Sequence, residues 1–166
     1  MQKPVSMLTM FKSRPVAKII LIQLYLWASI AMAYYGISLG VEELAGDIFV
    51  NTILMGVMEV SAVTILMFTL DKLSRRRATM FTFVGSGVCY LLTGFLDVYG
   101  TGDAALKAAT VFAVSGKFFS SACYSCIYIY SAELYPTSCR NTGFASVVLA
   151  SRIASIIVPF IVQGES

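Results

Sequence analysis

The sequence predicts an all-α membrane protein with five transmembrane helices. Of its 166 residues, 58% are hydrophobic and only 13% are charged, whereas soluble domains have about 45–50% and about 25%. The mean hydropathy of +0.80 means that the apolar residues are too many for one small water-soluble core. Apolar stretches of about 20 residues, the length that a helix needs to cross a bilayer core about 30 Å thick, recur along the chain.

Polar segments separate the five predicted spans, which form a partial bundle over residues 19–162. The predicted spans are 19–39, 48–70, 78–96, 105–130 and 142–162. The first span follows a cytoplasmic lead, residues 1–18, that lacks the apolar segment of a signal peptide. This span ends at an acidic turn that includes Asp47. The second ends at the basic loop 71–77, whose charges cannot continue into hydrocarbon.

The last three spans are bounded in the same way. The third lies between the basic loop and a polar, glycine-containing connection over residues 97–104. The fourth is followed by Pro136, which ends a helix because its ring clashes with the preceding turn and it has no N–H to donate. The fifth precedes residues 163–166, which we expect to form a short extracellular end.

The distribution of Lys and Arg predicts the orientation of these spans. Counted over alternate loops, one side holds nine of these residues and the other side holds only Lys107. The nine are Lys3, Lys12, Arg14, Lys18, Lys72, Arg75, Arg76, Arg77 and Arg140. By the positive-inside rule, the N-terminus and the basic loops are cytoplasmic and Ser166 is outside. We expect a multi-pass membrane protein with a cytoplasmic N-terminus, and the plasma membrane as its location.

Composition also argues against several classes of function. The chain has no histidine, the commonest general base and metal ligand, so we do not expect an enzyme or a metal site. The net charge of +3 reflects membrane orientation and is not taken to indicate nucleic acid. The four cysteines, among them the mid-helix pair Cys123 and Cys126, are expected to be free thiols that serve packing.

Three ionisable residues fall near the middle of predicted spans: Glu59, Lys117 and Arg152. Each costs about 2.5–3.5 kcal/mol at the bilayer centre on insertion scales, so such residues face a bundle interior or a wet cavity. One interpretation is a buried charge network that pairs Glu59 with Lys117 or Arg152 and holds the helices together. The other is a transport path, because one carboxylate cannot neutralise two cations and a substrate carboxylate could meet the excess charge.

Polar and aromatic side chains recur at helical spacing in two of the spans. The fourth span has a cationic and hydroxylated face made of Lys117, Ser120, Ser121, Tyr124 and Tyr128. The first span has a stripe that includes Trp27, Tyr34 and Ser38, with Tyr35 adjacent. Aromatic faces can hold organic cations through their ring quadrupoles. Helix packing explains such a stripe equally well.

Charges at the cytoplasmic loops suggest a clamp that gates the bundle. Glu133 ends the fourth helix, where the helix dipole disfavours a carboxylate unless cations lie near, and Arg75, Arg76 and Arg140 are available. Asp71 suits the amino end of a neighbouring helix. Ion pairs of this kind are worth about 0–1 kcal/mol each, which suits a latch that opens and closes. Simple positive-inside anchoring is the alternative interpretation.

The motifs in order resemble the organic cation, anion and carnitine transporters, solute carrier family 22, of the major facilitator superfamily. The matching strings are Tyr34-Tyr35-Gly36, Gly46-Asp47-Ile48, Glu59, Asp71-x-x-Ser74-Arg75-Arg76, Gly116-Lys117-Phe118, Ala132-Glu133-Leu134-Tyr135-Pro136-Thr137-x-x-Arg140-Asn141 and Ser151-Arg152. The resemblance implies spans seven to eleven of a twelve-helix fold, without the N-terminal six-helix half. The chain departs from the family where Ser74 replaces a glycine and Ser61 a proline.

The resemblance implies transport of small organic cations or zwitterions, carnitine-like, by alternating access. Arg152 together with Glu59 resembles the carnitine-type pattern. Under this interpretation Arg152 and Lys117 receive a substrate carboxylate, and Tyr34, Tyr35 and Tyr124 face its ammonium group. Glu59 pairs internally or binds a coupling ion, Na⁺ or H⁺, and no other cofactor is expected.

The expected partners are the lipid bilayer, a small organic ion and the missing six-helix half. Because such carriers place the path between two halves, we expect a truncated or partial transporter that does not transport alone. The alternative is a non-transporting membrane subunit or regulatory partner of a complete carrier. A sugar carrier is a weaker interpretation because the fourth span has Ser125-Cys126 where a Gly-Pro-x-Pro-Trp string would be expected.

Overall fold

The protein is described by a computed structural model that covers residues 14–40, 46–70, 74–100, 102–135 and 140–163. Its elements are five α-helices, and each predicted span lies within one of them. They are α2 (Arg14–Leu39), α3 (Ile48–Leu70), α4 (Arg75–Tyr99), α5 (Asp103–Leu134) and α6 (Arg140–Gln163). The predicted all-α class is therefore confirmed.

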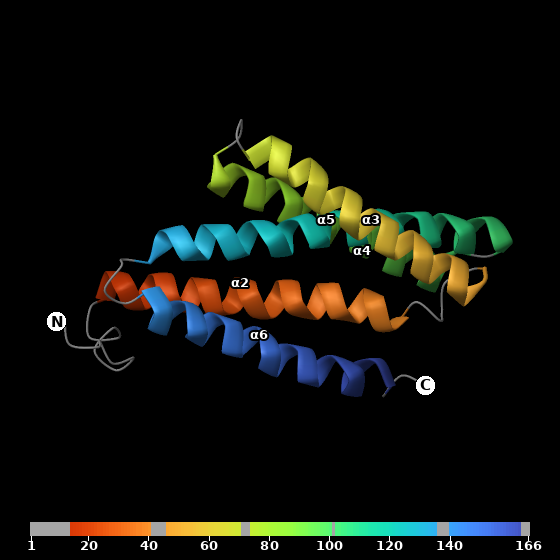
Figure 1. Cartoon of the computed structure of the whole chain (residues 1–166). Helices are drawn as coiled ribbons and strands as arrows, with labels where there is room; N and C mark the ends of the chain where they lie inside the picture. The colour runs from red at the N-terminus through yellow and green to blue at the C-terminus, as the bar shows by residue number, and fades with distance from the viewer. Residues whose placement is uncertain (1–13, 41–45, 71–73, 101, 136–139, 164–166) are drawn as a thin grey trace.

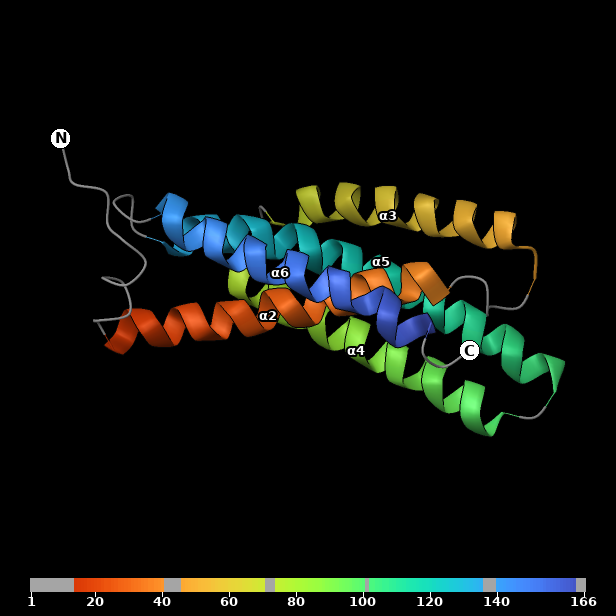
Figure 2. The ribbon, with the colours of Figure 1, turned by 90° about the horizontal axis from the view of Figure 1, so that it is seen from below.

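Helix α5 is the centre of the bundle. It contacts each of the other four helices, most extensively α4, with which it forms an antiparallel pair. Helix α2 packs along α6, and α3 lies against α5 on the side away from that pair (Figure 1). Seen from below, α3 and α4 flank α5 on different sides (Figure 2). The bundle therefore consists of the central helix α5, with the α2–α6 pair on one side of it and α3 and α4 packed separately against it.

The central position of α5 explains its composition. Helices α2, α3, α4 and α6 are long and apolar enough to cross a membrane by length and composition, and α5 is not among them. Its 32 residues include Lys117, Ser120 and Ser121, all of which are buried. These polar groups face neighbouring helices, so they do not meet lipid.

Three helix starts follow from local chemistry. Asp47 caps α3, because its Oδ1 accepts a hydrogen bond of 2.8 Å from the Phe49 N–H. Helix α5 starts after Gly102, which has a φ of 106° that only glycine adopts without strain. At α4, the Ala78 N–H donates to the Ser74 carbonyl over 3.1 Å, so Ser74 is the N-cap residue of the helix.

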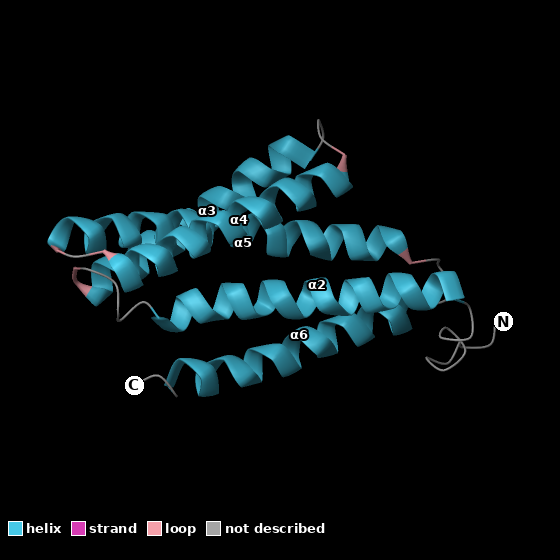
Figure 3. Cartoon of the chain, turned by 180° about the vertical axis from the view of Figure 1, so that it is seen from behind, coloured by secondary structure: helices cyan, strands magenta, loops and turns pink. Residues whose placement is uncertain are grey.

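Alternate helix ends gather at opposite ends of the bundle. The start of α2, the end of α3, the start of α4, the end of α5 and the start of α6 lie together, as Figure 3 also shows from behind. Among the described residues, Lys18, Arg75, Arg76, Arg77 and Arg140 lie on helix segments at this end, which we call the basic end. Lys107 and the three described aspartates lie on segments at the other end.

The core joins α2, α5 and α6 around one tryptophan. Trp27 is fully buried and packs with Ile30, Cys123, Ile127 and Val147. Its ring meets Tyr128 edge-on, with ring centroids 4.5 Å apart, a favourable arrangement for aromatic pairs. The packing of this aromatic group fixes the rotation of α2 against α5. That rotation decides which polar residues of the two helices meet.

Candidate functional site

An ion pair lies inside the bundle between α3 and α5. The Lys117 Nζ atom is 3.8 Å from Oε2 of Glu59, and the two side chains are 4% and 42% exposed. Of the cations that sequence reasoning placed mid-span, Lys117 is therefore the one that pairs with Glu59 among the described residues. Pairing offsets part of the cost of removing the ammonium group from water.

Two residues of α2 complete the surroundings of this pair. The Tyr34 hydroxyl donates to Oε1 of Glu59 over 2.5 Å. Lys117 Nζ donates to Oγ of Ser38 over 2.7 Å and lies 3.3 Å from the centroid of the Tyr34 ring. The ammonium group thus has a carboxylate, a hydroxyl and an aromatic face around it, a combination that stabilises a buried cation. We call Tyr34, Ser38, Glu59 and Lys117 the charge cluster.

The charge cluster borders a small cavity. Its volume is about 240 Å³, and its lining comes from α2, α3 and α5: Ser38, Thr52, Met55, Gly56, Glu59 and Lys117. A cavity of this size holds several water molecules, each of which has about 30 Å³ in the liquid. The carboxylate of Glu59 is thus accessible to water or to a small ion, while the ammonium of Lys117 stays covered.

Aromatic rings extend the charge cluster along α5. Tyr124 stacks on Tyr34, with centroids 5.3 Å apart and an angle of 28° between the rings. Tyr35 meets Tyr34 edge-on at 5.2 Å, and Tyr124 lies 5.3 Å from Tyr128. The three tyrosines that sequence reasoning assigned to substrate, Tyr34, Tyr35 and Tyr124, therefore form one continuous aromatic group next to Lys117.

Arg152 lies on α6, a helix that packs mainly along α2. Its side chain is exposed on α6, and it interacts electrostatically with Tyr124 of α5, which also has Ser151 as a polar neighbour. Within the described ranges, no carboxylate forms an ion pair with Arg152. Its guanidinium therefore has five N–H donors available to an anion that approaches the open face of α6.

The predicted gating residues do not all meet. Arg75 Nε lies 3.4 Å from Oε1 of Glu133, with both side chains substantially exposed. Arg140 instead donates from Nε to the backbone carbonyl of Tyr135 over 3.4 Å. Arg76 lines a separate cleft, and Asp71 lies outside the described residues. Their gating role stays a prediction.

A buried hydrogen-bond chain that sequence reasoning did not single out joins α2 to α5. Trp27 Nε1 donates to Oγ of Ser131 over 2.9 Å, and Ser131 donates to Oε1 of Gln23 over 3.0 Å. Gln23 is 2% exposed. The sequence contained one signal of this chain: Gln23 lies within an apolar stretch, and an amide without a hydrogen-bond partner in hydrocarbon is costly, so a partner was to be expected.

Cys123 and Cys126 are residues of α5 whose side chains contact α4, and both are fully buried. The Sγ atom of Cys126 is 3.1 Å from Oγ1 of Thr79, and Cys123 donates weakly to the Thr79 carbonyl. These contacts place both thiols in the helix interface. The structure records them as free thiols, together with Cys89.

A family model for sugar (and other) transporters matches residues 5–164. The chain belongs to this family. Curated relatives of this chain include solute carrier family 22 member 15 of Xenopus tropicalis, 34% identical over 159 residues. They also include organic cation/carnitine transporter 2 of Homo sapiens, 34% identical over 163 residues, and solute carrier family 22 member 4 of Mus musculus, 33% identical over 162 residues. The resemblance to solute carrier family 22 is thereby confirmed.

The match covers nearly all of this chain but a small part of its relatives. It includes 94% of the chain and 30% of the Xenopus protein, and 97% of the chain and 28% of the human protein. For the mouse protein the shares are 97% and 28%. The chain therefore spans under a third of the length of these relatives.

Proposed function

We propose that this chain forms part of a membrane carrier for small organic cations or zwitterions, carnitine-like, that works by alternating access. The observation that carries the proposal is the contact between the charge cluster and the three tyrosines across α2, α3 and α5. Arg152 on α6 is exposed and adds a cation that acts electrostatically on Tyr124. The name of the human relative, organic cation/carnitine transporter 2, supports the substrate class.

The contacts suggest separate tasks for the two intramembrane cations. Lys117 is buried and already paired with Glu59, so most of its charge is neutralised within the charge cluster. Arg152 has no carboxylate partner among the described residues. We therefore assign the substrate carboxylate to Arg152, which can bind it with two parallel hydrogen bonds.

The aromatic group suits the cationic end of the same substrate. Tyr34 and Tyr124 are half-buried and stacked, and Tyr35 presents its ring beside them. Rings in this setting attract a quaternary or protonated ammonium by about 0.5–2 kcal/mol. Because Lys117 already lies over the Tyr34 ring, a zwitterion would lie with its ammonium on Tyr35 and Tyr124 and its carboxylate toward Arg152.

Glu59 is assigned a coupling role at the small cavity. Its carboxylate holds Lys117 and accepts from Tyr34, yet the side chain is 42% exposed. A Na⁺ ion or a proton that reaches this carboxylate would compete with Lys117 for the negative charge. Release of Lys117 would then make a second cation available to the substrate.

A carrier of this type needs a second half on the open face of the bundle. Transporter paths of this kind lie between two helical repeats that move against each other. We propose that a six-helix N-terminal half completes the path. The Arg75–Glu133 pair, 3.4 Å long and largely exposed, is weak enough to break during each cycle.

Uptake measurements test the proposal. The chain is expressed in oocytes alone and together with the N-terminal six-helix half of a solute carrier family 22 protein, and uptake of radiolabelled carnitine and tetraethylammonium is measured. We expect uptake only on co-expression. Arg152→Ala is expected to lower carnitine uptake about 10- to 100-fold, the value of one charge-assisted hydrogen-bonded contact, and to affect tetraethylammonium much less.

Two variants serve as controls. Arg152→Lys keeps a positive charge and should retain part of the carnitine uptake. Lys107→Ala removes an exposed cation near the start of α5, far along the helix from Lys117 and Tyr124, and should leave uptake of both substrates unchanged. Equal effects of Arg152→Ala on both substrates would remove the proposed carboxylate contact. Co-purification of the two halves without any uptake would favour a non-transporting membrane subunit instead.

A further inference from the structure

The charge cluster surrounds its own lysine in the way a binding site surrounds an ammonium ligand. Lys117 Nζ donates to Oγ of Ser38 over 2.7 Å and lies 3.8 Å from Oε2 of Glu59. It also lies 3.3 Å from the centroid of the Tyr34 ring. A hydroxyl and a carboxylate accept the N–H donors of a primary ammonium, and an aromatic face attracts its charge. Helices α2 and α3 thus form the site, and α5 supplies the ammonium that fills it.

The acceptors of this site are oriented by partners other than Lys117. The Ser38 hydroxyl donates its proton to the Tyr34 backbone carbonyl over 2.8 Å, so its lone pairs are left to accept. The Tyr34 hydroxyl donates to Oε1 of Glu59, so Oε2 is left for a cation. The Tyr34 ring is in turn stacked on Tyr124, with centroids 5.3 Å apart. None of these three contacts involves Lys117, so they organise the site independently of the group that fills it.

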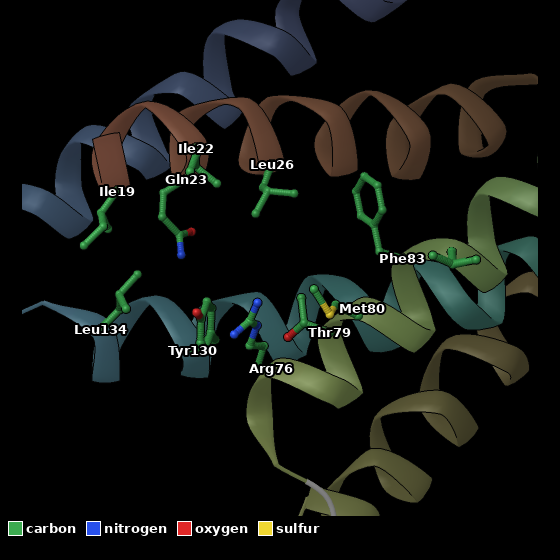
Figure 4. A pocket seen from close by; sticks show the side chains of 11 residues that line it. Ile19, Ile22, Gln23, Leu26, Arg76, Thr79, Met80, Phe83, Tyr130 and Leu134 are labelled. Carbon is green, nitrogen blue, oxygen red and sulfur yellow. The ribbon is translucent and has the colours of Figure 1, made fainter. Parts of the chain in front are cut away.

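Space for a ligand lies beside the lysine ammonium. The cavity of about 240 Å³ has Ser38, Glu59 and Lys117 in its lining. It is separate from the cleft that Arg76 lines, which Figure 4 shows, because the two share no lining residue. Truncation of Lys117 to alanine would add to this cavity a volume of the size of n-propylammonium, which is the part of the side chain beyond Cβ. The charged acceptors and the space thus belong to one site between α2, α3 and α5.

We propose that the charge cluster is a binding site for a primary alkylammonium group, and that Lys117 occupies it as a tethered competitor. A primary ammonium makes the same contacts as the lysine and can exchange with it. A quaternary ammonium has no N–H to donate to Ser38, so it stays on the other two tyrosines. The role in substrate selection rests on the proposed function: in a carrier of organic cations, Lys117 decides which substrates gain the contacts with Glu59 and Tyr34.

Tethering predicts that the unaltered chain binds such a ligand weakly. A group on a short flexible linker competes at an effective concentration of about millimolar or more. A free alkylammonium has to exceed this concentration to displace Lys117. Removal of the lysine ammonium leaves Glu59 as the counter-ion of the free ligand, so the apparent affinity for a primary ammonium should rise about 10-fold or more.

Chemical rescue of a truncated lysine tests the site. The Lys117→Ala chain is purified in detergent micelles, and its thermal unfolding is followed by the fluorescence of Trp27, which is buried and is the one tryptophan of the sequence. At a propylammonium concentration ten times its Kd, the Tm should rise by about 3–6 °C. At the same concentration, propan-1-ol, which lacks the charge, and tetramethylammonium, which lacks the N–H donors, should raise the Tm by no more than about 1 °C.

A second variant reverses the preference for ligand length. Lys117→Met keeps a stem that reaches about as far as the lysine Cε atom but carries no ammonium. Ammonium itself should therefore raise the Tm of this variant by about 3–6 °C at ten times its Kd, and propylammonium should not, because the stem fills its space. Tetramethylammonium chloride at equal ionic strength is the salt control. The methionine also keeps the packing of the stem, so this variant provides the test if Lys117→Ala does not fold.

Two further variants show whether the response comes from this site. Lys107→Ala truncates an exposed lysine of the same helix and should respond to propylammonium no more than the unaltered chain does. Addition of Glu59→Gln to Lys117→Ala removes the counter-charge and should abolish the rise in Tm. An equal rise with propan-1-ol, a rise that survives Glu59→Gln, or no rise in a folded Lys117 variant with its matching ligand would overturn the ammonium site.

The outcome is independent of the uptake experiment proposed above. Rescue of the Lys117 variants together with failure of the predicted Arg152→Ala effect on carnitine uptake would remove the proposed transport role and leave the ammonium site in place. The reverse pattern would refute the ammonium site alone.

Discussion

Replacement of Glu59 by glutamine tests the physical basis of the charge cluster. Gln keeps the shape of the side chain and an oxygen that accepts from the Tyr34 hydroxyl, but it removes the negative charge 3.8 Å from Lys117 Nζ. The Lys117 ammonium is then left with the Ser38 hydroxyl and the Tyr34 ring. We expect Glu59→Gln to destabilise the bundle, because a covered cation loses its counter-charge.

The magnitude follows from the distance and the exposure of the pair. Two unit charges 3.8 Å apart attract by about 4 kcal/mol at an effective dielectric constant of about 20. Glu59 is 42% exposed, so water screens part of this energy and we expect a loss of about 2 kcal/mol. For a chain of this size, that loss lowers the Tm by about 4–8 °C.

Thermal unfolding with a thiol-reactive dye measures this shift. Cys123 and Cys126 are fully buried, so their reaction with the dye reports opening of the α4–α5 interface. A double-mutant cycle with Lys117→Met isolates the pairwise energy, since the double variant has neither charge. We expect the double variant to unfold at a higher temperature than Glu59→Gln alone.

Asp97→Asn is the matched control, because it also converts a carboxylate to an amide but lies exposed near the end of α4. It should change the Tm by no more than about 1–2 °C. If the shifts of Glu59→Gln and Lys117→Met simply add in the double variant, the two charges do not interact. The assignment of Glu59 as the partner of Lys117 would then be refuted.

Two further predictions concern the basic end and the α4–α5 interface. Thermal unfolding of a double-mutant cycle of Arg75→Gln and Glu133→Gln should give a coupling energy below about 1 kcal/mol, because both side chains are substantially exposed. A coupling energy above about 2 kcal/mol would mean that this ion pair is too strong to open and close during transport. Gly116→Ala should destabilise by about 1–3 kcal/mol, because its new Cβ would lie 2.4 Å from Cε1 of Tyr90. Gly87→Ala, where a Cβ meets open space, should be neutral or slightly stabilising, and equal shifts of the two variants would refute the packing argument.

Helix positions were predictable because they depend on local composition. The predicted spans lie inside the observed helices, which extend further by up to four residues at the ends of α5 and five at the start of α2. The ends differ because helices continue into polar residues until a cap or a proline stops them. The alternation of basic and acidic helix ends was likewise predictable from the sequence, because five helices that cross in turn place successive loops at opposite ends of the bundle.

Sequence spacing predicted which candidate residues share a helix face, but not which of them pair. Spacing placed Lys117 and Tyr124 on one face of α5, and Tyr34 and Ser38 on one face of α2. It left open whether Glu59 meets Lys117 or Arg152, because a helical pattern fixes which residues share a face but not which helix that face meets. The Gln23–Ser131–Trp27 chain and the cleft at Arg76 also depend on contacts between distant segments.

The sequence by itself determined that this chain is a helical membrane protein, where its helices run and which residues bring charge into the hydrocarbon. Hydrophobicity and helical periodicity are properties of neighbouring residues within a few turns, so they can be recognised in the sequence without the tertiary structure. Only the tertiary structure decided that Lys117 is covered and paired while Arg152 stays exposed on α6. The reason is that the rotation of α2 and α6 around α5 follows from side-chain packing centred on Trp27, to which residues more than 100 positions apart contribute. Helix α3 packs in a separate core, where Leu66 and Leu70 meet Ala78 and Cys126.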